Sequence, residues 1–213
     1  MINIYNMDCM EAMKGMSDNQ FDLAIVDPPY GIGADKAQNA GGKKWGYKKY
    51  KETDWDKDIP TPEYFKQLFR ISKNQIVWGG NYMTEYLKPS MGWILWDKGQ
   101  RDFSLADGEL AWTSFNRALR IFTMPRGAAL QDANNNGGER IHPTQKPVKL
   151  YEWLLMKYAN ENNKILDTHL GSGSIAIACH NLGYDLTGYE IDKDYYEAAQ
   201  KRIKEHQSQL RIL

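Results

Sequence analysis

The chain has few cysteines, no excess of either charge and no long hydrophobic run. Its 213 residues include two cysteines, Cys9 and Cys179, too few for a disulfide framework or a cysteine-rich zinc site. We therefore expect a protein of a reducing, cytoplasmic compartment. No apolar stretch approaches the length of a transmembrane helix, and no secretory leader opens the sequence, so no membrane association is expected.

Positive and negative side chains balance in number. Lys and Arg together number 27, and so do Asp and Glu, which makes the formal net charge zero. This balance argues against a protein held on nucleic acid by its global charge, so any phosphate contacts must come from local cationic clusters. The length suits one domain over residues 1–213 with a substantial core.

Strand-like and helix-like segments alternate along the chain, which is typical of an α/β sheet. We expect strands near 3–9, 21–26, 75–78, 93–96, 109–115, 120–122, 164–166 and 186–189, and helices near 11–16, from Thr61, near 147–159 and from Asp192. Two stretches, 31–60 and 123–142, are expected to be loops. Loops of this length are usually functional or disordered.

The most informative motif is Asp27-Pro28-Pro29-Tyr30, directly after the apolar run 21–26. The prolines lack backbone N–H groups, so Asp27 and Pro28 keep unpaired acceptor oxygens where the strand stops. Tyr30 adds a flat aromatic face beside them. Because α/β sheets bind ligands at the carboxyl ends of their strands, the motif predicts a site for a planar amine such as a nucleobase edge. A turn that only ends the strand is the alternative.

A second motif begins where the strand at 164–166 reaches Asp167 and continues through a Gly-Ser loop into a helix. Glycines at such a turn let backbone N–H groups approach a ligand at the positive end of the helix dipole. Glu190 ends the next strand, 19 residues after Gly171, where it can accept hydrogen bonds from ribose hydroxyls. The pattern predicts a nucleoside cofactor, and NAD must be considered.

Two features count against NAD. The carboxylate of Asp167 would repel a pyrophosphate. The unit that holds this motif has only two strands, so a third must come from elsewhere, and residues 3–7 are the obvious donor. The cofactor half and the Asp27 half then form one sheet in permuted order.

The chain resembles the S-adenosylmethionine-dependent DNA amino-methyltransferases of the permuted, β-type motif order. In that order the Asp-Pro-Pro-Tyr motif precedes the cofactor loop. The motifs that carry the resemblance are Asp8-Cys9, Asp27-Pro28-Pro29-Tyr30, His142-Pro143-Thr144-Gln145-Lys146-Pro147, residues 167–174, Glu190 and Asp192. Together they span most of the chain, and their combination is specific although no single part is.

The resemblance implies a Rossmann-like class I methyltransferase fold. Its sheet would have seven strands, mostly parallel with one antiparallel strand, and helices on both faces. S-adenosylmethionine would bind at the carboxyl ends of the strands, with Glu190 at the ribose and Asp8 and Cys9 at the adenine. The full implied cofactor set is Asp8, Cys9, Asp27, Thr144, Gln145, Lys146, Asp167, His169, Gly171, Ser172, Gly173, Ser174, Glu190, Ile191 and Asp192.

One departure from the family concerns Thr168-His169-Leu170, where members usually have Pro-Phe after the first acid. We expect it to alter the packing around the methionine portion, which the resemblance assigns to Asp167 and the glycine loop.

The implied reaction is methyl transfer to the N6 amino group of adenine in double-stranded DNA, without a metal. Asp27, Pro28, Pro29 and Tyr30 would be the catalytic residues: Asp27 and the Pro28 carbonyl accept the amine hydrogens, and the extruded base stacks on Tyr30. Cytosine N4 is the nearest alternative substrate, although Ser-Pro-Pro-Tyr is commoner there. Asp27 also disfavours the glutamine methylation of related Asn-Pro-Pro-Tyr enzymes, and a regulator that has lost catalysis remains a further alternative.

Contacts with DNA are expected from cationic residues in the two long loops. Residues 43–51 hold five lysines and three aromatics, so Lys43, Lys44, Lys48 and Lys49 are candidates, against the alternative of a solvated loop. Arg126 and Arg140 are further candidates. Two further candidates lie just past strand ends: Asn81 and Asp97-Lys98. Their positions suit either the lining of the base pocket or a capping role at the strand ends. The recognition sequence, a homodimer and an accompanying restriction endonuclease are left open.

Overall fold

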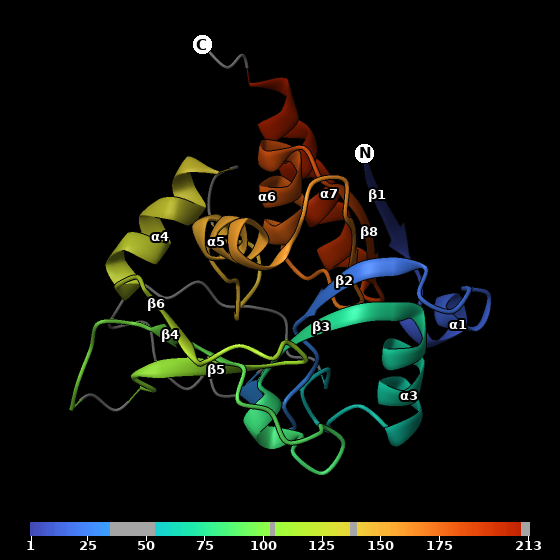
Figure 1. Ribbon diagram of the computed structural model, residues 1–213. Helices are drawn as coiled ribbons and strands as arrows, with labels where there is room; N and C mark the ends of the chain where they lie inside the picture. Colours follow the sequence, from blue (N-terminus) through green and yellow to red (C-terminus); the bar gives the residue numbers. More distant parts are fainter. Residues whose placement is uncertain (35–53, 103–104, 137–139, 210–213) are drawn as a thin grey trace.

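The structure is a computed structural model that describes residues 1–34, 54–102, 105–136 and 140–209 (Figure 1). Within these residues eight strands form one sheet, in the order β1-β8-β7-β2-β3-β5-β4-β6. The strands are β1 (Ile2–Asn6), β2 (Phe21–Val26), β3 (Ser72–Trp78), β4 (Trp93–Asp97), β5 (Gly108–Thr113), β6 (Arg120–Thr123), β7 (Lys164–Asp167) and β8 (Asp185–Glu190). The helices are α1 (Cys9–Lys14), α3 (Pro62–Ile71), α4 (Arg126–Asn135), α5 (Val148–Tyr158), α6 (Ser174–Leu182) and α7 (Lys193–Ser208), with the 3-10 turn η2 (Gly80–Tyr82).

The α/β class is confirmed, and the strand count of seven is wrong by one. β6 extends the sheet by pairing with β4 in parallel, from Ile94↔Arg120 to Asp97↔Thr123. β5 is antiparallel to both of its neighbours, as the family resemblance implies. β1 pairs in parallel with β8, so the amino-terminal strand supplies the third strand of the cofactor half.

Strand order reverses between β2 and β7, which are parallel neighbours in the middle of the sheet. From β2 the chain continues on one side to β3, and from β7 on the other side to β8. Both carboxyl ends therefore open at one edge of the sheet, with Asp27 after β2 and Asp167 at the end of β7. Such a reversal is where open α/β sheets bind ligands.

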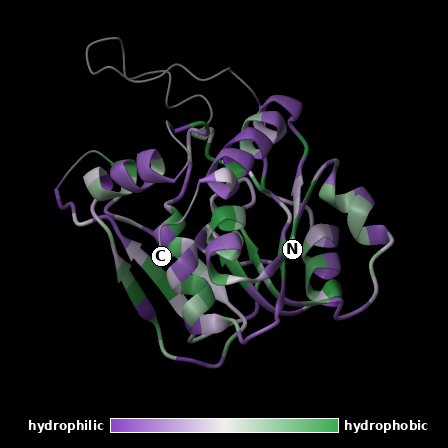
Figure 2. Cartoon of the chain, turned by 90° about the horizontal axis from the view of Figure 1, so that it is seen from above, coloured by the Kyte–Doolittle hydropathy of each residue, from purple (hydrophilic) through white to green (hydrophobic). Residues whose placement is uncertain are grey.

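Helices cover both faces of the sheet. One hydrophobic cluster joins the strands to α5, α6 and α7 through Leu154, Ile177 and Ile203, and α1 and α3 pack on the opposite face through Met13 and Leu68 (Figure 1). Hydrophobic residues gather along the central strands and on parts of the helices beside them (Figure 2). Among the helices of the described residues, none has the length and apolar character needed to cross a membrane.

The expected loop at 123–142 is wrong over half of its length, because α4 occupies residues 126–135. The run from Asn134 contains the residues at which this helix ends. Asp132 is 3% exposed, and its carboxylate accepts the N–H of Val148, the first residue of α5, at 2.6 Å. A tertiary contact therefore stabilises the helix, and the local sequence pattern does not predict this contact.

Two of the predicted helix starts agree with the structure, whereas α1 begins at Cys9 and not near residue 11. Asp192 caps α7, and its carboxylate accepts the N–H groups of Asp194 and Tyr195 at 2.8 and 3.0 Å. Thr61 and Pro62 begin α3, with proline in the first turn, where its missing N–H costs nothing.

Candidate active site

Two neighbouring cavities open at the carboxyl ends of the strands. The larger has a volume of about 420 Å³ and the smaller about 240 Å³. Both are lined by Asp27, Trp55, Thr144, Gln145 and Lys146. Asp27 therefore stands at the boundary between two compartments, which suits a reaction that joins two separately bound molecules.

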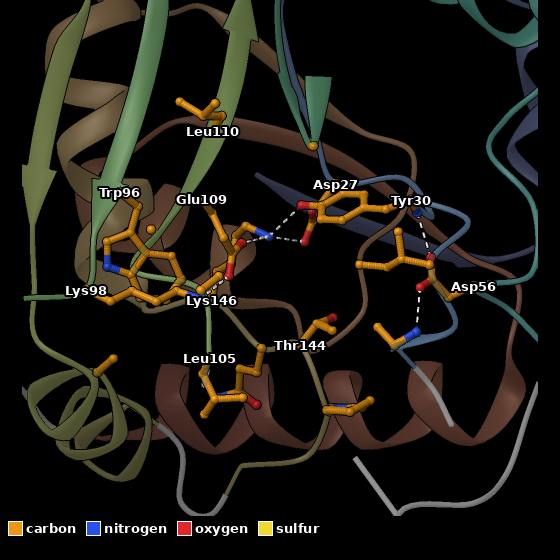
Figure 3. A pocket seen from close by; sticks show the side chains of 18 of the residues that line it. Asp27, Tyr30, Asp56, Trp96, Lys98, Leu105, Glu109, Leu110, Thr144 and Lys146 are labelled. Atoms are coloured by element: carbon orange, nitrogen blue, oxygen red, sulfur yellow. Dashed lines mark hydrogen bonds and ion pairs between the residues drawn. The ribbon is translucent and has the colours of Figure 1, made fainter. Parts of the chain in front are cut away.

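The carboxylate of Asp27 is held by two protein donors (Figure 3). Tyr30 donates its hydroxyl to Oδ1 at 2.6 Å, and the Lys146 ammonium donates to Oδ2 at 2.6 Å. Lys146 also lies 3.1 Å from Glu109 Oε2, and Lys98 lies 2.6 Å from Glu109 Oε1. Two acids and two lysines thus alternate along the wall of the larger cavity and balance each other's charge.

Burial and charge act against each other within this network. Burial raises the pKa of Asp27, the Lys146 ammonium opposes this, and the Glu109 carboxylate adds to it. Burial alone would lower the pKa of Lys146, but the carboxylates of Asp27 and Glu109 raise it above its ordinary value. For Glu109, burial is outweighed by Lys146 and Lys98, which hold its pKa at about 2. Lys146 is therefore a permanent cationic donor, and Glu109 a permanent anion, at neutral pH.

Tyr30 is fixed by packing as well as by its hydrogen bond. Its ring stacks on Tyr82, with centroids 5.3 Å apart and planes 18° from parallel. Gly79, just after β3, has a φ of +67°, and a Cβ at this position would clash with the Tyr30 ring. Glycine is therefore required at position 79 both for its backbone conformation and for the space that Tyr30 occupies.

Asp56 is a site residue that sequence reasoning missed. Its side chain, 1% exposed, accepts the N–H groups of Tyr30 and Gly31 on Oδ1 at 2.6 and 3.0 Å and that of Ala34 on Oδ2 at 2.7 Å. These bonds satisfy the backbone donors that follow the two prolines and fix the direction of the chain there. A single acid in a long polar loop belongs to no recognisable sequence motif. The adjacent Trp55 was the one local sign that this part of the loop is buried.

The glycine loop lines the smaller cavity through Gly171, Ser172 and Ser174. Gly171 and Gly173 have φ values of +51° and +72°, which favour glycine. Glu190 accepts the N–H of Gly171 at 2.8 Å and that of Asp192 at 2.9 Å, one on each oxygen. Burial raises the pKa of Glu190, and these two N–H groups oppose the rise. Each Glu190 oxygen retains a further lone pair for a ligand.

The structure brings most of the predicted cofactor residues together. Those that line the smaller cavity are Asp27, Thr144, Gln145, Lys146, His169, Gly171, Ser172, Ser174, Glu190, Ile191 and Asp192. His142 and Tyr195 line it as well and were not predicted.

Four predicted cofactor residues lie outside the lining of both cavities. Asp8 caps α1 by accepting the N–H of Met10 at 2.8 Å, and Cys9 is 8% exposed in the core. Burial raises the pKa of Asp167 to about 8, and its carboxylate accepts the backbone N–H of His169 at 3.0 Å. Gly173 caps α6. Asp8 and Gly173 therefore stand at helix starts, and Cys9 and Asp167 are buried.

The predicted nucleic-acid contacts fall partly within the described chain. Arg126 and Arg140 line the larger cavity, and Arg140 donates to the Pro143 carbonyl. Asn81 and Lys98 line it as well, whereas Asp97 pairs with Arg101 at 2.9 Å. The lysine candidates lie outside the described residues: Lys43, Lys44, Lys48 and Lys49.

Known proteins similar to this chain include type II methyltransferases. Residues 120–201 match the N6_N4_Mtase family, described as DNA methylase. The chain is 26% identical to the type II methyltransferase M.HpaI of Haemophilus parainfluenzae over 235 aligned positions, which cover 92% of this chain and 72% of that protein. It is 24% identical to the type II methyltransferase M2.DpnII of Streptococcus pneumoniae over 244 positions, covering 94% and 89%.

Two solved structures have the same fold as this chain. The M1.HpyAVI–SAM complex superposes with a TM-score of 0.60 at 21% identity, covering 95% of this chain and 99% of that chain. The PvuII DNA methyltransferase, which is cytosine-N4-specific, superposes with a TM-score of 0.60 at 13% identity, covering 94% and 86%. With its motif order and its two cavities meeting at Asp27, the chain is similar to the N6/N4 DNA methylases.

Proposed function

We propose that the protein transfers a methyl group from S-adenosylmethionine to the N6 amino group of adenine in double-stranded DNA. The observation that carries the proposal is the position of Asp27, whose carboxylate faces both cavities. In this arrangement the smaller cavity holds the cofactor and the larger cavity holds the target base. The transfer then takes place across the boundary at Asp27.

The residues of the smaller cavity suit this cofactor. Glu190 has acceptor capacity left for ribose hydroxyls after binding the N–H groups of Gly171 and Asp192. The left-handed glycines keep the loop free of side chains where a ligand approaches the start of α6. When bound, S-adenosylmethionine supplies an electrophilic methyl group on a sulfonium.

Asp27 and the Pro28 carbonyl orient the target amine. The exocyclic amine of adenine is a weak nucleophile because its lone pair is delocalised into the ring. If the two oxygens accept its N–H groups, the lone pair localises toward the methyl group. With S-adenosylmethionine bound, the nitrogen–carbon bond would form as the sulfur–carbon bond broke, S-adenosylhomocysteine would leave, and the proton lost by the amine would go to water. The protein contributes position and charge, and the Lys146 ammonium opposes the rise that burial causes in the pKa of Asp27.

The target base must leave the duplex to reach Asp27. Tyr30, stacked on Tyr82, and Trp96 supply aromatic surfaces in the wall of the larger cavity. Arg126 and Arg140 add positive charge to the same wall, where phosphates flanking an extruded nucleotide can pair with them.

Cytosine N4 is the second candidate target. The structural likeness to the cytosine-N4-specific PvuII enzyme keeps it open, and both amines would present the same two hydrogens to Asp27. The acid at position 27, where cytosine enzymes more often have serine, favours adenine. Whether the protein acts as a homodimer or beside a restriction endonuclease is a separate question.

The test is direct analysis of the methylated nucleoside. Purified protein is incubated with S-adenosylmethionine and duplex DNA, and the DNA is digested and examined by mass spectrometry. We expect N6-methyladenine, and Asp27→Ala serves as the control that should yield none. Detection of N4-methylcytosine would identify cytosine and not adenine as the target. The absence of any methylated base on diverse duplexes would refute the proposal. Single-molecule sequencing of the same DNA then gives the sequence context.

A further inference from the structure

A buried hydrogen-bond chain leads from α3 to the smaller cavity. The Tyr64 hydroxyl lies 2.7 Å from Thr168 Oγ1, which lies 2.9 Å from His169 Nδ1. Tyr64 is 2% exposed and Thr168 3% exposed, whereas His169 reaches the lining of the cavity. The Tyr64 and His169 rings also meet edge to face, with centroids 5.5 Å apart. Thr168 and His169 are the residues at which the chain departs from the family pattern.

Counting donors gives this chain a direction. Within the described residues the Tyr64 hydroxyl has one partner, Thr168, so its proton must go there. Thr168 then donates its own proton to His169 Nδ1, its other partner. In the opposite direction the Tyr64 proton would be buried without an acceptor. Burying a donor without a hydrogen bond carries a large free-energy penalty, so this direction is unfavourable.

An acceptor role for Nδ1 fixes the imidazole tautomer. The proton of the neutral ring must sit on Nε2, which has no hydrogen-bond partner among the described residues. Burial lowers the pKa of His169 to about 4, so the ring is neutral at physiological pH. The ring therefore presents one N–H donor, of defined position, to whatever the smaller cavity holds.

We propose that Tyr64 and Thr168 hold His169 as the Nε2–H tautomer, which donates a hydrogen bond to the α-carboxylate of S-adenosylmethionine. The assignment of the ligand rests on the function proposed above. Within the described lining the acids are Asp27, Glu190 and Asp192, and the one cation, Lys146, already holds Asp27 and Glu109. A carboxylate is the strongest acceptor on the cofactor, and because Lys146 is already paired, the neutral Nε2–H of His169 is a donor available to bind it.

Ring nitrogen NMR of the ligand-free protein tests the relay without reference to any ligand. We expect His169 as the Nε2–H tautomer in the wild type and a mixture of tautomers in Tyr64→Phe, which loses only the phenolic oxygen. Tyr86→Phe is the matched control, because this ring stacks on Phe65 at 5.2 Å, outside the lining of both cavities. A wild-type His169 protonated on Nδ1, or a tautomer unaltered in Tyr64→Phe, would overturn the relay.

Calorimetry with two ligands tests the carboxylate contact. S-adenosylhomocysteine retains the α-carboxylate, and 5′-methylthioadenosine lacks the whole amino-acid portion. His169→Phe keeps an aromatic ring but removes the donor, so we expect at least tenfold weaker binding of the first ligand and unchanged binding of the second. Equal losses for both ligands, or none for either, would overturn the contact while leaving the proposed function standing. If the wild type bound neither ligand, the contact and the proposed function would both fall, and the NMR result would still decide the relay.

Discussion

Glu109→Gln removes one charge from the centre of the ion-pair network and leaves the shape of the side chain almost unchanged. In the wild type Glu109 lies between Lys98 and Lys146, whose side chains are 11% and 2% exposed. The neutral amide cannot compensate either cation, so two lysines would share the single charge of Asp27. Lys146 would then be drawn more fully onto the oxygen that must accept the target amine.

The magnitude follows from burial. Removing one partner of a buried ion pair typically costs about 3–5 kcal/mol, and the Glu109 side chain is 25% exposed, so we expect the lower end, about 3 kcal/mol. For a domain of this length that loss lowers the unfolding midpoint by roughly 6–12 °C. Competition for Asp27 should also lower kcat by about tenfold or more, since a hydrogen bond to a charged group is worth roughly 1.5–3 kcal/mol. The KM for S-adenosylmethionine should stay close to the wild-type value.

The pH dependence supplies a second signature. The folded pKa of Glu109, about 2, lies below its ordinary value of 4.5, so its contribution to stability is fully present above pH 4.5. That contribution is lost as the pH falls from 4.5 toward 2. The stability difference between wild type and Glu109→Gln should therefore shrink over this interval.

Thermal unfolding at several pH values and steady-state methylation measure these effects. Glu63→Gln is the matched control, because Glu63 pairs with Lys66 at 3.4 Å on the surface, and exposed pairs contribute little. The control should leave both the midpoint and kcat unchanged. If Glu109→Gln behaved like Glu63→Gln, the reasoning about the network would be refuted.

Four further predictions concern the proposed site. Asp27→Ala should abolish methyl transfer while S-adenosylmethionine binding stays nearly unchanged, and wild-type turnover would contradict its role. Asp56→Ala should lower kcat more than it changes cofactor affinity, because the backbone after Pro29 loses three hydrogen bonds; equal kcat values would make Asp56 a spectator. Glu190→Ala should weaken cofactor binding by roughly 1.5–3 kcal/mol, and calorimetry showing undiminished affinity would remove it from the site. Finally, each lysine that neutralises a phosphate adds about 0.9 to the magnitude of the slope of log affinity against log salt. A variant with four lysines changed to Ala should therefore show a flatter slope when duplex binding is measured across salt concentrations: Lys43, Lys44, Lys48 and Lys49. An unchanged slope would mean that the run is only a solvated loop.

The sequence alone predicts the α/β class, the permuted motif order and the positions of Asp27, Asp167 and Glu190 at the ends of strands. Hydrophobic periodicity and turn chemistry are local properties, so β2 could be read together with Asp27, and β8 together with Glu190. The pairing of β1 with β8 followed because an incomplete cofactor half needs a third strand, and the amino-terminal segment was the available one.

Only the tertiary structure shows which side chains contact those motifs. Lys146 meets Asp27 across 119 residues of chain, and Asp56 meets Tyr30 across 26. No periodicity encodes such contacts, because their partners are chosen by how the loops fold over the edge of the sheet. The helix α4 likewise depends on a carboxylate, Asp132, that bonds to the start of another helix. The local sequence determines which chemical groups lie at a strand end. Long-range packing determines the partners of those groups, and the partners in turn set the charge and orientation of each group.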